Sequence, residues 1–226
     1  MIIQTPAIIL RRFPYGDTSI IAHVFARETG KVSVIVKGAR RKGSIMAACF
    51  QPLSYLDIIY YHKDTRDIQT ISKADFIQTW SRFSEDLNAV SMALALLEIT
   101  DKTMVNYDPH PELFDSLVAV ISAFDIGLVP KNILYWHYQL RVLTIMGFKP
   151  DILNKELPDY GIIANKINSQ HILSLLLNTD LSDIPEIKIS AAEKKTISNY
   201  IYDQFRRHFE GMNELKSMKV LRQLVV

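Results

Sequence analysis

The spacing of apolar residues changes near residue 80, from a period of two to a helical period. Residues 2–13, 18–26, 31–36, 55–62 and 68–74 are rich in β-branched and aromatic residues, and turn-forming residues separate them. A short helix is predicted over residues 45–50, between the third and fourth strands. Five short strands with one small helix in that position are typical of an OB-fold barrel, although other small barrels share the strand count.

The rest of the chain is predicted to be helical. Ser190 and Glu193 form a capping-box pattern, and Gly147 stands where a helix would end. Residues 148–168 are predicted to be irregular, and the helices are predicted over residues 87–104, 112–124, 132–146, 170–177, 190–210 and 214–224. We therefore predict an α+β protein, with an N-terminal OB-fold β-barrel over residues 1–80 and an all-α helical domain over residues 81–226.

Positive charge is concentrated in the strand-forming region. Residues 1–80 hold 11 Lys/Arg against 6 Asp/Glu, a net charge of +5, whereas residues 81–226 hold 15 against 18, a net charge of −3. Residues 37–43, with the sequence KGARRKG, contain four cations and no acid. Such cations repel each other unless an anion is near, and glycine lets the backbone approach a ligand closely. This basic loop predicts contact with a phosphate backbone, and the alternative is a solvated hairpin loop.

More cations and aromatic rings flank the first predicted strand. Arg11 and Arg12 are expected at its end, with Phe13 and Tyr15 in the loop that follows. In an OB barrel this loop and the sheet face beside it flank the ligand groove, where rings stack on bases and cations hold phosphates. The alternative is that such rings fill or cover the barrel, and Tyr60 is open to the same two interpretations. The predicted DNA-binding residues are Arg11, Arg12, Tyr15, Lys37, Arg40, Arg41 and Lys42.

No pattern of catalytic residues is present. The chain lacks a GxxxxGK[ST] or GxGxxG phosphate loop, a GxSxG elbow and an HExxH motif, and its six histidines are scattered. The single cysteine, Cys49, rules out an intramolecular disulfide and a multi-cysteine zinc site. The N-terminus has no signal-peptide features, and the most apolar helical run is too short to span a bilayer. We expect a cytoplasmic protein with no catalytic residues, cofactor or metal.

Several segments resemble the RecO family of bacterial recombination and repair mediators. The similarity is most specific in AIILRRFPYGDTS at residues 7–19 and ETGKVSVIVKGAR at residues 28–40. Residues 51–55, 140–151 and 202–221 also resemble the family, so the similarity extends over nearly the whole chain. Many members carry a four-cysteine zinc module that would fall at residues 151–165, where this chain has no cysteine.

The resemblance implies an OB fold followed by a helical domain, and a nucleoid-associated protein that binds single- and double-stranded DNA. It also implies annealing of complementary strands and cooperation with RecR, which together help RecA replace single-stranded DNA-binding protein (SSB) during repair of gaps and double-strand breaks. The family contacts the acidic, hydrophobic C-terminal tail of SSB through its helical domain. One alternative function is a protein-interaction adaptor whose barrel does not bind DNA directly, and another is an RNA-binding OB protein.

Overall fold

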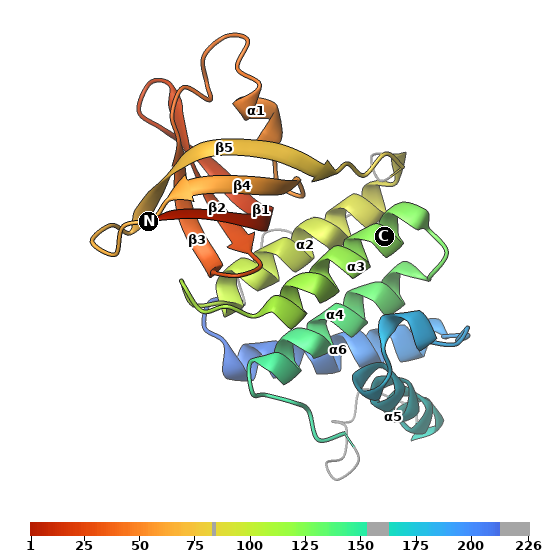
Figure 1. Ribbon diagram of the computed structural model, residues 1–226. Coiled ribbons are helices and arrows are strands. Elements are labelled where there is room, and N and C mark those ends of the chain that lie inside the picture. Colours follow the sequence, from red (N-terminus) through yellow and green to blue (C-terminus); the bar gives the residue numbers. More distant parts are fainter. Residues whose placement is uncertain (83–84, 153–162, 213–226) are drawn as a thin grey trace.

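The N-terminal part of the molecule is a closed five-stranded barrel. The computed structural model describes residues 1–82, 85–152 and 163–212. The barrel elements are β1 (Ile2–Tyr15), β2 (Ser19–Ala26), β3 (Gly30–Val36), α1 (Met46–Cys49), β4 (Tyr55–Tyr61) and β5 (Ile68–Gln78). The strands close in the order β1-β2-β3-β5-β4, and β3 and β5 pair in parallel while the other neighbours are antiparallel (Figure 1). This topology confirms the predicted OB fold.

The barrel interior is filled by alternate residues of its strands. Ile20, Ala22 and Val24 of β2 face the same interior cluster as the three valines of β3. Cys49 and Phe50 at the end of α1 also belong to this cluster, as does Tyr60 of β4. The hydroxyl of Tyr60 donates to Thr29 Oγ1 at 3.0 Å, so this ring is a packing residue and is not available to a ligand.

Five α-helices are seen in the described residues of the second part of the molecule. They are α2 (Leu87–Thr103), α3 (Pro111–Ile126), α4 (Lys131–Ile145), α5 (Ile163–Asn178) and α6 (Ala191–His208). The capping box of Ser190 and Glu193 at the start of α6 is confirmed. Helix α5 begins at residue 163, seven residues before its predicted start. The predicted helix at residues 214–224 lies outside the described residues.

Helix α4 lies at the centre of the helical part. Eight consecutive residues, from Ile133 to Leu140, are buried, as expected for a helix surrounded by others. Helices α2, α3, α5 and α6 all pack against it. Its aromatic residues Tyr135, Trp136 and Tyr138 are therefore core residues. No described helix combines the length and apolar character needed to cross a membrane.

The barrel and the helices share one apolar core. Ile8, Leu10, Phe25 and Leu53 of the barrel belong to the same buried cluster as the helix residues. Phe25 meets Phe114 of α3 edge to face, with ring centroids 5.3 Å apart. In Figure 1 the barrel accordingly rests on α2 and α3. Because apolar side chains fill the contact, the barrel and the helices are held in one fixed arrangement.

Backbone contacts tie the β2–β3 turn to the loop between α2 and α3. The amide of Tyr107 donates to the carbonyl of Lys31 at 2.9 Å, and Gln69 Nε2 donates to the Tyr107 hydroxyl at 2.8 Å. Gly30 has a φ of 72°, and a Cβ at this position would overlap the carbonyl group of Asp108, 2.5 Å from its carbon. Only glycine fits this turn, because it tolerates the positive φ and lets the loop approach.

A bidentate ion pair lies beside these contacts. Arg27 donates from Nε to Asp115 Oδ1 at 2.8 Å and from NH2 to Asp115 Oδ2 at 2.7 Å. Asp115 belongs to α3, so this pair is a second polar connection between the barrel and the helices. The Arg27 guanidinium holds the pKa of Asp115 below its ordinary value.

Candidate nucleic-acid interface

An irregularity in β1 decides which of its side chains face a ligand. Ile9 pairs with Val24 and Arg11 pairs with His23, so Leu10 is an extra residue in the strand. Arg11 therefore lies on the outer face of the barrel and Arg12 on the other face of the strand. The sequence placed these two arginines together, whereas the structure separates their side chains.

The outer face beyond this bulge carries exposed aromatic rings. Phe13 pairs with Ile21, Ile21 pairs with Ile35, and Tyr15 pairs with Ser19. We call these five residues the open sheet face. Phe13 is 39% exposed and Tyr15 is 53% exposed. Tyr15 was predicted in a loop, and that prediction was wrong: β1 continues to Tyr15, so both rings are fixed on a strand. The outer surface of strands 2 and 3 is where OB folds bind oligonucleotides.

The basic loop lies at the end of this face and is held in place by Arg40. The Arg40 amide donates to the carbonyl of Thr18 at 2.8 Å, and its NH1 donates to the carbonyl of Gly16 at 3.0 Å. The loop is thereby attached to the β1–β2 turn. Lys37, Arg41 and Lys42 are exposed, and in the part of the chain that the structure describes they form no ion pair. Their charges therefore face solvent without compensation.

Arg12 joins the same end of the barrel from the other side of β1. Its NH1 donates to the carbonyl of Ala47, within α1, at 3.3 Å. Together with Arg40 it flanks a hollow of about 200 Å³, whose remaining wall is formed by Phe13, Pro14 and Ile20. The structure thus gathers Arg12, Tyr15 and the basic loop around one end of the barrel.

Arg11 has a different environment from the other predicted cations. Its Nε lies 2.7 Å from Asp101 Oδ2 of α2, and His23 Nδ1 lies 2.8 Å from Asp101 Oδ1. The Lys31 ammonium is 3.8 Å from the same carboxylate. Burial tends to raise the pKa of Asp101, but the hydrogen bond from His23 and the nearby cations outweigh it and hold the pKa below its ordinary value. Asp101 is therefore ionised at neutral pH.

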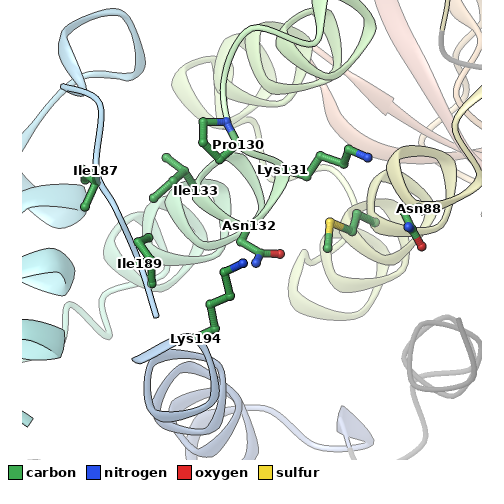
Figure 2. Close-up of a pocket in the computed structure, with 9 residues that line it drawn as sticks. Asn88, Pro130, Lys131, Asn132, Ile133, Ile187, Ile189 and Lys194 are labelled. Atoms are coloured by element: carbon green, nitrogen blue, oxygen red, sulfur yellow. The ribbon is translucent and has the colours of Figure 1, made fainter. Parts of the chain in front are cut away.

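A second hollow, of about 380 Å³, lies in the helical part between α2, α4 and the start of α6 (Figure 2). Ile133, Ile187 and Ile189 supply an apolar side, and Lys194 extends from α6 toward Asn132. Lys131 also lines the hollow and is paired with Asp86. Sequence reasoning missed this hollow because its lining comes from separate segments, each of which is unremarkable by itself.

Potential metal ligands are scattered in the part of the chain that the structure describes. Among residues 1–82, 85–152 and 163–212, no group of three His, Cys, Asp or Glu side chains is arranged to hold a metal ion. Cys49 is buried, and burial raises the pKa of its thiol. It therefore packs as a small apolar residue.

The closed barrel, its basic loop and the attached helices are the architecture of an OB-fold protein with an appended helical part. Residues 1–80 match the family model described as "Recombination protein O N terminal", and residues 84–155 match "Recombination protein O C terminal". The chain belongs to the RecO family of DNA repair proteins.

Similar proteins cover the whole chain. DNA repair protein RecO of Salinibacter ruber is 27% identical over 245 residues, which span 99% of this chain and 94% of the relative. DNA repair protein RecO of Exiguobacterium sibiricum is 27% identical over 249 residues, spanning 100% and 98%. DNA repair protein RecO of Chlorobium phaeobacteroides is 30% identical over 152 residues, which span 67% of this chain and 58% of the relative.

Proposed function

We propose that this protein is a DNA-binding recombination mediator without catalytic residues. It anneals complementary single strands and, together with RecR, helps RecA load onto SSB-coated DNA during repair of gaps and double-strand breaks. Membership of a family of DNA repair proteins supports this proposal. The observation that carries it is the set of exposed, uncompensated cations on the basic loop, beside the rings of the open sheet face.

The proposed mechanism needs only binding. Lys37, Arg40, Arg41 and Lys42 neutralise phosphates and release their counterions. Phe13 and Tyr15 stack on bases, which carries little sequence preference because every base has an aromatic face. Two complementary strands repel each other less when cations on one surface neutralise both. Annealing then requires no nucleotide hydrolysis, and double-stranded DNA binds through the same phosphate contacts.

Single-stranded DNA binding measured against salt concentration tests this proposal. Changing the four loop cations to alanine should weaken binding and reduce the salt slope by roughly 3, because each phosphate contact on a single strand contributes about 0.7. The rate of annealing of complementary strands should fall together with DNA binding. The control variant carries alanine at four exposed cations of the helical part, which removes the same charge elsewhere; these are Lys188, Lys195, Arg206 and Arg207.

Three outcomes would change the interpretation. An unchanged slope in the loop variant and a reduced slope in the control would move the DNA path to α6. No DNA binding at low salt, together with a tight and salt-independent complex with a protein, would favour the adaptor. Tighter binding of RNA than of DNA at equal length would favour an RNA-binding protein.

The hollow in Figure 2 supports the proposed contact with the SSB tail. An acidic tail with apolar side chains needs cations next to an apolar wall, and Lys194 lies beside Ile187 and Ile189. We expect Lys194→Glu to weaken binding of an SSB tail peptide, measured by fluorescence anisotropy. Lys195→Glu is the matched control, because this neighbouring residue is exposed and does not line the hollow. Equal loss in both variants would place the tail elsewhere.

A further inference from the structure

The outer face of the barrel continues past the open sheet face and reaches helix α2. Arg11 pairs with His23, and His23 pairs with Ser33, in the row of side chains next to the Phe13–Ile21–Ile35 row. Asp101 of α2 contacts this row directly. A carboxylate from the helical part therefore occupies the same barrel surface on which we propose that DNA binds.

The contacts of Asp101 resemble those expected for a bound phosphate. A carboxylate only accepts hydrogen bonds, so His23 Nδ1, 2.8 Å away, must carry the proton, and the Arg11 guanidinium forms an ion pair with the other oxygen, its Nε 2.7 Å away. Lys31 Nζ donates to the backbone carbonyl of Asp101 at 2.5 Å. Three cationic or donor side chains from three neighbouring strands thus surround one residue, whose carboxylate side chain is 8% exposed.

Arg11 differs from the other two donors because it reaches solvent. Its side chain is 58% exposed, whereas His23 is 18% and Lys31 is 13% exposed. It lies next to Phe13 along the outer face of β1. A DNA backbone crossing the open sheet face would meet Arg11 next, and would there compete with Asp101 for the same guanidinium.

We propose that Asp101 is a built-in competitor of DNA: it fills a phosphate position formed by Arg11, His23 and Lys31, and withholds Arg11 from the DNA path. This inference rests on the proposed DNA binding and extends it. In this structure Asp101 occupies Arg11, so the proposed DNA path over the open sheet face stops before this arginine. A movement of α2 that released Arg11 would add one phosphate contact, so the position of the helical part would set the affinity of the barrel for DNA.

Asp101→Asn compared with Asp115→Asn tests the proposal. Each change removes one negative charge with which the helices pair to the barrel, but only Asp101 contacts the outer-face cations. We expect the Asp101→Asn chain to bind a single-stranded oligonucleotide more tightly than the Asp115→Asn chain. Its advantage should grow about 2.6-fold as salt falls from about 200 to about 50 mM, because one added contact contributes about 0.7 to the salt slope.

Arg11→Ala, made in the natural chain and in Asp101→Asn, identifies the cation responsible. We expect Arg11→Ala to weaken single-stranded DNA binding only slightly in the natural chain. In the Asp101→Asn chain it should remove the affinity that this change gained. A large loss and a shallower slope in the natural chain would overturn the proposal, whether or not the Asp101 variant folds. Equal binding by the Asp101 and Asp115 variants would overturn it while DNA binding stands. Absence of binding in every chain would overturn both.

Discussion

Replacing Gly30 by alanine is expected to separate the barrel from the α2–α3 loop. The new Cβ would overlap the carbonyl of Asp108, which is a backbone group and cannot rotate away. The left-handed backbone at this position costs an alanine about 1–2 kcal/mol. Displacing the loop also breaks two hydrogen bonds of Tyr107, to Lys31 and from Gln69, each worth about 1 kcal/mol. The expected loss of unfolding free energy is therefore about 3–4 kcal/mol.

Denaturant unfolding followed by circular dichroism measures this loss, and thermal unfolding should shift by about 6–16 °C for a chain of this size. Gly16→Ala is the matched control. Gly16 also has a positive φ, of 55°, but a Cβ there would meet no atom within 4 Å, so only the backbone strain applies. If the two variants lost the same stability, the close approach of Asp108 would contribute nothing and the reasoning would be refuted.

Two further predictions concern single residues. Phe13→Ala should weaken single-stranded DNA binding by about 1–3 kcal/mol without changing the salt slope, because a stacked base is lost but no cation; Tyr61→Ala, an exposed ring on β4, should have no effect. Burial lowers the pKa of His137 below its ordinary value of 6.5. As the pH falls through 6.5, His137 therefore binds a proton in the unfolded chain while it stays neutral in the folded protein. Stability should thus be constant above about pH 6.5 and fall below it, and His137→Gln, measured by denaturant unfolding between about pH 7 and 5, should flatten that fall.

The barrel could be predicted from the sequence because its strands obey a local rule. Ile20, Ala22 and Val24 alternate with residues of the other face, and this period of two predicts a strand. The three residues fill the barrel interior, and Phe25 on the other face packs against the helices. The bulge at Leu10 could not be predicted, because one extra residue leaves the composition of the strand unchanged. That single residue decides that Arg11 faces α2 while Arg12 faces α1.

The site was predictable only in part, because a local pattern shows neighbouring residues but not contacts between distant parts of the chain. The charge of the basic loop is visible in seven consecutive residues, whereas Asp101 meets His23 across 78 positions of the chain. One signal was present: Asp101 falls on the apolar stripe of its helix, after Leu94 and Leu97. A carboxylate at such a position requires a buried cationic or hydrogen-bonding partner, although the sequence does not show which one.

The apolar cluster that runs from Phe25 to Phe114 has a consequence for how the chain unfolds. A barrel cut from the helices would expose Ile8, Leu10, Phe25 and Leu53 to water as one patch, because helix side chains cover them in the whole protein. The barrel and helices are therefore expected to melt as a single cooperative unit, with one calorimetric transition whose van't Hoff and calorimetric enthalpies agree. A fragment ending near residue 80 would be prone to self-association. The strand-forming part and the helical part are therefore expected to fold together and not as two independent modules.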